Sequence, residues 1–282
     1  MPTWFFTSDL HGSEGRVRAL VAAIRAERPE AVLIGGDLLP NRSPRGGDFL
    51  EDVLVESLLD LKRDLGQAAP AVLVILGNDD PASVEPAIRD AETRGAWTWV
   101  EGRRAFVGGR PVYGCGLVPP TPFLLKDRER YDVSRFLDPG AVSPEEGWRS
   151  VPVTPEEARR TLGEALDALV GDDDLSEAVL LLHSPPYGTA LDRAGLDDRW
   201  VDHVPLDVHV GSIAVRRLVE ARHPRLVLCG HVHEAARLTG TWREQIGSTH
   251  VLQGAHDGPE LSLVRVDPAN PASATRDLID TA

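Results

Sequence analysis

The sequence predicts an α/β fold, and two observations support this class. Five short runs are rich in Val, Ile, Leu and Phe and apolar throughout, which is typical of strands covered on both faces. Segments with a helical spacing of apolar residues lie between several of these runs, and such alternation indicates an α/β architecture. The strand-like runs are residues 4–7, 31–34, 71–76, 178–182 and 226–229.

The first two helices follow the first two strand-like runs. Apolar residues recur at i, i+3, i+4 and i+7 across residues 17–24, and with approximately that spacing across residues 50–58. Residues 97–115 instead suggest strands joined by short turns, because Gly108 and Gly109 separate two apolar stretches.

The sequence predicts that a helix begins at Thr154. Its hydroxyl can cap a helix, Pro155 suits the first helical position, and Glu157 would complete a capping box. We expect this helix to run to about Val170 and to stop before the acidic run 172–174, which predicts a solvated turn.

Residues 118–153 are rich in Pro, Asp, Glu and Arg and have weak periodicity. They predict a long surface excursion that overhangs a functional site, since long loops in compact domains are often functional. With no internal repeat and no clear linker, we expect one domain over residues 1–282.

Composition excludes several classes of protein. The chain has 282 residues, 42% of them hydrophobic, so it can bury a sizeable core without a structural metal. Its formal charge of −14 argues against general nucleic-acid binding and against binding to anionic membranes. A site that handles phosphate would therefore need local positive charge, which bound metal ions would supply.

Compartment is predicted from the cysteines and the N-terminus. Cys115 and Cys229 cannot form a disulfide framework, and each lies in an apolar run where a free thiol is expected to be buried. The N-terminus lacks the pattern of a signal peptide, and no apolar run approaches the ~18 residues of a membrane span. We expect a soluble, cytoplasmic protein.

Polar clusters follow the five strand-like runs directly. In open α/β sheets, ligand sites lie at the carboxyl ends of strands, so these clusters are expected to meet. Any one pair alone is weak evidence, because a lone His-x-His or an Asp after a strand is common. The clusters are Asp9-Leu10-His11, Gly36-Asp37, Gly77-Asn78, His183 and Gly230-His231-Val232-His233.

The clusters together predict a metal site. Residues i and i+2 of an extended segment point the same way, so Asp9 with His11, and His231 with His233, can each reach one ion. Imidazole, carboxylate and amide ligands without thiolate suit Mn²⁺, which we favour, or Fe, Zn²⁺, Co²⁺ or Ni²⁺. Seven ligands suffice for two ions that share one carboxylate, an arrangement that serves phosphoester hydrolysis.

The order of these clusters resembles the calcineurin-like metallophosphoesterase superfamily over residues 4–266. Residues 183–189, 192–193, 209–212 and 230–234 are similar to the small prokaryotic Icc-related phosphoesterases. The resemblance implies a four-layer α/β/β/α sandwich of two facing mixed β-sheets with helices outside.

The resemblance also implies roles. One metal would be held by Asp9, His11 and His233, the other by Asn78, His183 and His231, with Asp37 bridging both. A hydroxide that bridges the metals would attack phosphorus, and Asn78 would also lie beside the substrate phosphate.

Two of the clusters depart from the family pattern. Many relatives have a histidine after the asparagine that stabilises or protonates the leaving group, whereas this chain has Asp79. A carboxylate with a reference pKa of ~3.9 is a poor proton donor at neutral pH. Alternatively, Asp79 orients Asn78 or caps the following helix. The second cluster ends Pro40-Asn41-Arg42 where relatives often carry a further aspartate.

Other histidines are assigned less directly. His209 is a candidate to line the pocket, and His256 and His250 either project toward the site or lie on the surface or at a strand end. His203 and His223 are expected in loops. Tyr187, Arg193 and residues 118–153 are candidates to shape the pocket.

The leading hypothesis is a metal-dependent hydrolase of a phosphodiester or activated phosphomonoester, with a small phosphoester, such as a nucleotide, as substrate. The alternative is a catalytically weak metal-binding scaffold for protein interaction, which should tolerate the loss of ligands. A binuclear hydrolase acting on another substrate class is a third possibility, and nothing in the sequence indicates an oligomeric state.

Overall fold

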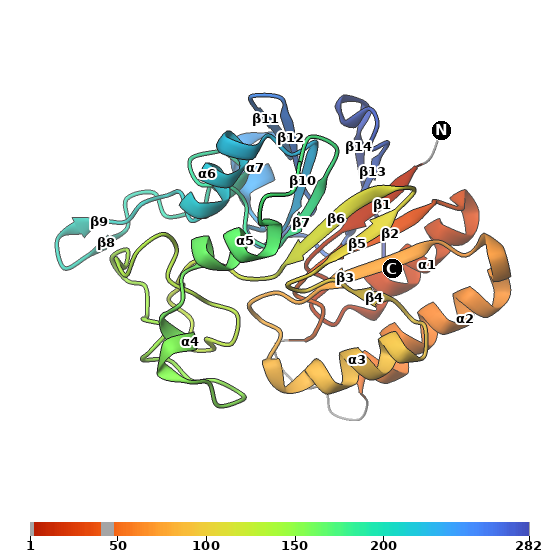
Figure 1. Cartoon of the computed structure of the whole chain (residues 1–282), viewed down its shortest axis with the longest axis horizontal. Coiled ribbons are helices and arrows are strands. Elements are labelled where there is room, and N and C mark those ends of the chain that lie inside the picture. Colours follow the sequence, from red (N-terminus) through yellow and green to blue (C-terminus); the bar gives the residue numbers. More distant parts are fainter. Residues whose placement is uncertain (1–2, 41–47, 282) are drawn as a thin grey trace.

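The computed structural model describes residues 3–40 and 48–281, and it contains two six-stranded mixed sheets packed face to face with helices on both outer sides (Figure 1). This arrangement confirms the predicted four-layer α/β/β/α sandwich. Asn41 and Arg42, where the sequence departs from the family pattern, lie outside the described residues.

The first sheet has the strand order β14-β13-β1-β2-β3-β4. Strands β1 to β4 are parallel, and β13 and β14 extend the sheet in antiparallel fashion. The bounds are β1 Trp4–Thr7, β2 Ala31–Gly35, β3 Ala71–Ile75, β4 Thr98–Trp99, β13 Leu261–Val266 and β14 Thr275–Ile279.

The second sheet has the order β11-β12-β10-β7-β6-β5, with its four inner strands parallel. A separate two-stranded hairpin, β8 with β9, projects from one end of the molecule (Figure 1). The bounds are β5 Arg104–Val107, β6 Arg110–Cys115, β7 Val179–Leu182, β8 Trp200–Val201, β9 Val204–Pro205, β10 Leu226–Cys229, β11 Arg243–Ile246 and β12 Thr249–Gln253.

Helices cover the two outer faces. Helices α1, α2 and α3 pack on the first sheet, and α5 and α6 pack on the second. The helices are α1 Glu14–Glu27, α2 Glu56–Leu65, α3 Glu85–Thr93, α4 Pro155–Arg159, α5 Leu162–Val170, α6 Ile213–Arg222 and α7 Ala235–Thr239. Short helical segments are the π-helical Phe49–Val55 and the 3-10 turns Gly66–Ala68, Ala82–Val84, Ala190–Asp192 and Pro271–Ser273.

Successive side chains of a strand point to opposite faces of the sheet, so each strand contributes to two layers of the core. On β1, Trp4 and Phe6 point between the sheets and contribute to a core with Leu181 and Leu228, whereas Phe5 points outward against the helices. All five of these side chains are buried. Both faces of each sheet are therefore covered, which explains why the inner strands are apolar throughout.

The predicted helix over residues 154–170 is wrong in one respect: it is two helices. Arg160 is extended (φ −61°, ψ 135°) and separates α4 from α5. Thr154 does cap α4, but the capping box is formed by Thr161 and Glu164 at the start of α5. The acidic run 172–174 is an exposed turn, as predicted.

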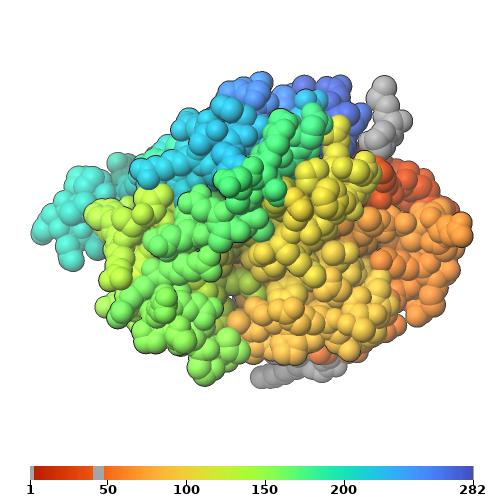
Figure 2. Space-filling model, in the orientation of Figure 1, coloured from red at the N-terminus to blue at the C-terminus, as the bar shows by residue number. Residues whose placement is uncertain are grey.

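Residues 118–153 contain no helix or strand, and Figure 2 shows them as yellow-green and green atoms on the surface. They nevertheless have a polar interior of their own. Lys126 and Glu129 are fully buried as an ion pair, and Glu129 also accepts a hydrogen bond of 2.6 Å from the Thr121 hydroxyl. The charged residues that suggested a solvated loop are thus partly its core.

Two carboxylates fasten this segment to the loops at the carboxyl ends of the strands. Asp127 accepts from the backbone N–H of Ala82 at 2.7 Å, just after β3. Asp132 accepts from the backbone N–H of Ile213 and from the Ser212 hydroxyl, both at 2.6 Å, at the start of α6. The segment therefore borders the edge of the sheets where the polar clusters lie.

Cys115 and Cys229 are buried free thiols, as the sequence predicted. Among the described residues, no helix is both long enough and apolar enough to cross a membrane.

Candidate metal centre

The loops after β1, β2, β3, β7 and β10 meet at one edge of the two sheets, and they bring the seven predicted ligands together. Six of them form two groups whose donor atoms all lie within 4.8 Å of one another, and Asp37 belongs to both. The seventh, Asn78, joins the second group through a contact of its Oδ1 with His183 Nε2 at 3.1 Å. The groups are Asp9, His11, Asp37 and His233, and Asp37, His183 and His231. Asp9 and His11 share a group, as their spacing predicted. His231 and His233 do not, because the backbone at His231 has a φ of 72° and is not extended.

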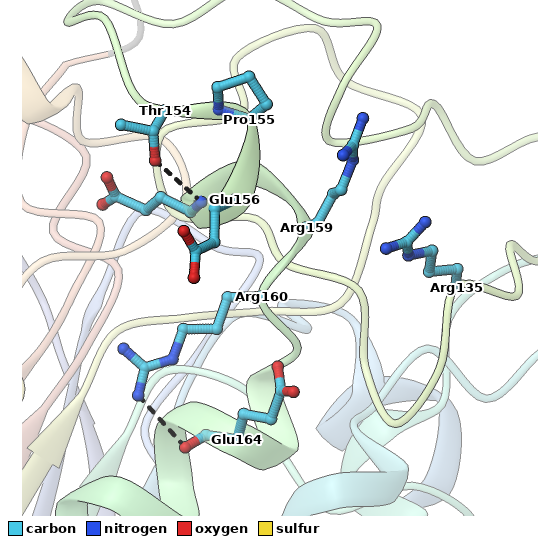
Figure 3. Close-up of a pocket in the computed structure, with 8 residues that line it drawn as sticks. Arg135, Thr154, Pro155, Glu156, Arg159, Arg160 and Glu164 are labelled. Carbon is cyan, nitrogen blue, oxygen red and sulfur yellow. Dashed lines mark hydrogen bonds between the residues drawn. The ribbon is translucent and has the colours of Figure 1, made fainter.

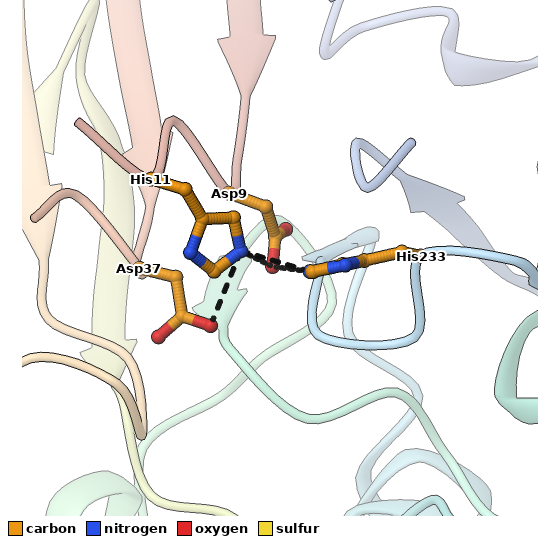
Figure 4. A group of neighbouring side chains, drawn as sticks. All are labelled: Asp9, His11, Asp37 and His233. Atoms are coloured by element: carbon orange, nitrogen blue, oxygen red, sulfur yellow. Dashed lines mark hydrogen bonds and ion pairs between the residues drawn. The ribbon is translucent and has the colours of Figure 1, made fainter. Parts of the chain in front are cut away.

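The first group is shown in Figure 4, where its four side chains point toward a common centre. His233 Nε2 lies 3.0 Å from both Asp9 Oδ1 and His11 Nε2. His11 Nε2 lies 3.8 Å from Asp37 Oδ2.

The second group shares Asp37. Its Oδ2 lies 3.3 Å from His183 Nε2, and the rings of His183 and His231 have centroids 5.2 Å apart. His183 Nδ1 contacts the Gly35 carbonyl at 2.7 Å, so its other nitrogen, Nε2, is directed toward Asp37 and Asn78. This is the outer contact that usually orients a metal-binding histidine.

The backbone at the cluster is strained. Asp9, His11, Asp37 and His231 all have positive φ, between 47° and 72°. A non-glycine residue in this region costs roughly 1 kcal/mol or more, and such strain concentrates at functional sites. Four of the seven predicted ligands are held in this way.

Close approach explains the glycines at Gly77 and Gly230. A Cβ at Gly77 would lie 2.2 Å from Asp37 Oδ1, and one at Gly230 would lie 2.5 Å from Asp9 Oδ2 and 2.0 Å from Ser8 Oγ. Any other residue would displace a carboxylate of the cluster.

Electrostatics prepare the cluster for cations. Burial tends to raise the pKa of Asp9, but His233 and the other imidazoles outweigh it and hold that pKa well below its usual range. For Asp37, burial is likewise outweighed, by His183, and its pKa is lowered. Burial and the charge of His183 lower the pKa of His231 to about 3, so this imidazole is neutral and free to bind an ion.

Comparison with known proteins decides the family. The family model for calcineurin-like phosphoesterases matches residues 3–235. The chain belongs to this family. The uncharacterized protein MJ1162 of Methanocaldococcus jannaschii is 33% identical to it over 81 residues, which are 28% of this chain and 31% of that protein. The crystal structure of TT1561 of Thermus thermophilus has the same fold, with a TM-score of 0.58, 18% identity and coverage of 99% of this chain and 100% of that one.

The donor set of this calcineurin-like phosphoesterase fits divalent metal ions. Nitrogen and oxygen ligands lie about 2.0–2.2 Å from such ions, so two ligands of one ion are at most about 4.4 Å apart. The contacts of 3.0–3.9 Å among Asp9, His11, Asp37 and His233 meet this condition. The first group could therefore hold one ion, and the 3.3 Å between Asp37 Oδ2 and His183 Nε2 meets the same condition in the second.

Asp80 is a member of the site that the sequence did not assign. Its fully buried carboxylate accepts backbone N–H bonds from Leu38 and Gly77 at Oδ2 and from Leu39 at Oδ1, all at 2.9–3.0 Å. It thereby ties the loop of Asp37 to the loop of Asn78. Burial and the charge of Asp37 raise the pKa of Asp80 to about 7 despite these bonds.

Arg16 on α1 was also missed. Its guanidinium donates to the backbone carbonyls of Asp9, Gly258 and Glu260 and so fixes the loop that bears the first ligand. Neither residue had a signal in the sequence, because an aspartate in a turn and an arginine on a helix are ordinarily solvated.

Asp79 contacts the cluster and does not cap a helix. The segments that follow it, Ala82–Val84 and α3, begin without a side-chain cap. Its carboxylate instead accepts from Asn78 Nδ2 at 3.1 Å. Helix capping by Asp79 is therefore ruled out, whereas its hydrogen bond with Asn78 agrees with a role in orienting that amide.

The remaining histidines and pocket candidates lie outside the two groups. His209 Nδ1 contacts the buried carboxylate of Asp192 at 2.8 Å, and its ring packs near that of Tyr187. His256 Nε2 contacts Glu260 at 3.0 Å, and Arg193 pairs with Asp197. Of the others, His250 is on β12, His203 is in the turn between β8 and β9, and His223 ends α6.

A wide surface cleft lies around α4 (Figure 3). Arginine and glutamate side chains line it together, with Arg160 donating to the Glu164 carbonyl. None of its lining residues is a predicted ligand, so this cleft is separate from the metal centre.

Proposed function

We propose that this protein is a metal-dependent phosphoesterase that hydrolyses a phosphodiester or an activated phosphomonoester at a binuclear site. The supporting observation is the pair of donor groups that share Asp37. Two such groups side by side suit two ions about 3.5–4 Å apart, the arrangement used for in-line displacement at phosphorus. Membership of the calcineurin-like family supports the same reaction class.

Seven side chains would hold the two ions. Asp9, His11 and His233 would bind the first, Asn78, His183 and His231 the second, and Asp37 both. When bound, the ions supply positive charge for the phosphate oxygens and generate a nucleophile from water near neutral pH. The ligand set lacks thiolate, and we favour Mn²⁺ over Fe, Zn²⁺, Co²⁺ and Ni²⁺.

Charge balance explains how an acidic protein would attract phosphate. Asp9 and Asp37 are the two carboxylates of the donor groups, and the other donors are imidazoles, which would be neutral when bound to an ion, and an amide. Two dications there would leave a local positive charge on a chain whose formal net charge is −14. The site would therefore select anionic substrates, of which a nucleotide is one candidate.

The leaving group would receive little help from residue 79. Asp79 presents a carboxylate where many relatives have an imidazole, and it accepts a hydrogen bond from Asn78 instead of offering a proton. General acid catalysis normally contributes about 10²–10⁴-fold. We therefore expect a preference for good leaving groups, such as aryl phosphates, over alkyl monoesters.

Metal analysis combined with a panel of phosphomonoesters and phosphodiesters tests the proposal. The expected result is two transition-metal ions per chain and turnover of aryl phosphoesters, with Asp37→Asn as the inactive blank. A scaffold role predicts instead that no member of the panel is hydrolysed, even with metal bound.

A further inference from the structure

Asp79 makes contacts with three of the seven predicted ligands. Its Oδ1 accepts from Asn78 Nδ2 at 3.1 Å, and its Oδ2 lies 3.8 Å from His11 Nδ1. Its backbone N–H donates to Asp37 Oδ1 at 2.9 Å. His11 belongs to the first donor group, Asn78 joins the second, and Asp37 is the carboxylate that the two groups share.

Asp79 is positioned to act as the hydrogen-bond acceptor that the His11 imidazole requires. His11 Nε2 faces Asp9, Asp37 and His233, so Nε2 is the nitrogen that would bind an ion. Nδ1 must then carry the proton and needs an acceptor. In the described part of the chain, the buried Nδ1 has no hydrogen-bond partner, and the Asp79 carboxylate lies before it.

The contact with Asn78 fixes the orientation of an amide. An ionised carboxylate only accepts, so the NH₂ group of Asn78 turns toward Asp79 and its oxygen turns toward His183. An amide binds a divalent ion through its oxygen, so this is the productive orientation.

We propose that Asp79 is a positioning residue that aligns one ligand from each donor group, His11 through Nδ1–H and Asn78 through its amide. The inference rests on the proposed binuclear site and adds to it a reason for a carboxylate at this position. Asp79 raises metal affinity by holding both ligands in their binding orientation.

Mn²⁺ binding to the metal-free full-length protein, followed by calorimetry, tests this role. We expect Asp79→Ala to weaken Mn²⁺ binding by roughly 10–100-fold, the usual effect of removing a group that orients a metal ligand. Asp79→Asn keeps one acceptor oxygen, which can face Asn78 or His11 but not both, and should show an intermediate loss. The matched control is Asp172→Asn, which removes an exposed carboxylate from a turn and should leave affinity unchanged.

Thermal unfolding of the metal-free variants separates positioning from folding. A positioning role predicts that the Tm of metal-free Asp79→Asn stays at the wild-type value while Mn²⁺ affinity falls. Equal Mn²⁺ affinity in the wild type and both Asp79 variants would overturn the inference and leave the phosphoesterase proposal intact. A wild-type chain that binds no Mn²⁺, Zn²⁺ or Co²⁺ would overturn both.

Discussion

Gly230→Ala tests whether the metal centre is as closely packed as the structure indicates. The added methyl carbon would lie 2.0 Å from Ser8 Oγ and 2.5 Å from Asp9 Oδ2. Asp9 cannot yield easily, because its carboxylate accepts from the His231 N–H at 3.2 Å and contacts His233 Nε2 at 3.0 Å. Ser8 Oγ could rotate away only by losing its 3.1 Å bond to the Gly35 carbonyl.

The expected magnitudes follow from overpacking. Inserting a carbon into a filled core costs about 1–3 kcal/mol. For a chain of this size, that cost lowers Tm by roughly 2–6 °C. Displacing the Asp9 carboxylate from the first donor group should weaken metal binding by roughly 10–100-fold, as loss of ligand orientation usually does.

Differential scanning fluorimetry and metal-binding calorimetry measure the two effects. Gly195→Ala is the matched control, since its methyl carbon would meet no atom closer than 3.8 Å. If Gly230→Ala kept the Tm and the metal affinity of Gly195→Ala, Gly230 would not be required by close approach, and the packing of Asp9 described above would be incorrect.

Four further outcomes are expected. Asp80→Ala should lose about 3 kcal/mol or more in urea unfolding, because three buried backbone N–H groups lose their acceptor; a loss no greater than that of Asp172→Asn would refute its tying role. The pKa of Asp80, about 7, lies above its unfolded value of 3.8, so its contribution is complete below about pH 4 and is lost as the pH rises through 7. Metal-free wild type should therefore lose stability relative to Asp80→Asn between pH 5 and pH 8, and a constant difference would contradict that shift. Lys126→Ala should cost about 3–5 kcal/mol, because it leaves Glu129 buried without its partner; the paired replacement Lys126→Met with Glu129→Leu should cost less, and equal losses would show that the pair is not coupled. Asp79→His should raise the rate on alkyl monoesters relative to aryl diesters, and an unchanged ratio would show that residue 79 does not act on the leaving group.

The sequence predicted the inner strands and the positions of the polar clusters most directly. Apolar runs such as Leu226–Cys229 formed inner strands, because a sheet covered on both faces buries every side chain of a short apolar run. Parallel strands of one sheet place their carboxyl ends at one edge, so the polar residues that follow β1, β2 and β3 were expected to meet, as were those that follow β7 and β10. The facing of the two sheets brings the two sets together.

Charged residues were harder to interpret because their burial depends on partners that the sequence does not show. Residues 118–153 were expected to form a surface excursion, yet Lys126 and Glu129 within them are buried as an ion pair. Asp79 and Asp80 are adjacent and identical, but one contacts ligand side chains and the other contacts backbone N–H groups. The division of the helix at Arg160 did have a signal, since Thr161 and Glu164 are spaced as a capping box, but the start signal at Thr154 and Pro155 was interpreted as the beginning of a single helix.

Asp37 is shared by the two donor groups, and we propose that it is required for phosphoester hydrolysis. The most direct test of this requirement is the steady-state hydrolysis of bis(p-nitrophenyl) phosphate by Mn²⁺-loaded wild type, Asp37→Asn and Asp172→Asn. We expect turnover by the wild type and by Asp172→Asn, and loss of turnover in Asp37→Asn. Equal turnover by Asp37→Asn and the wild type would contradict it.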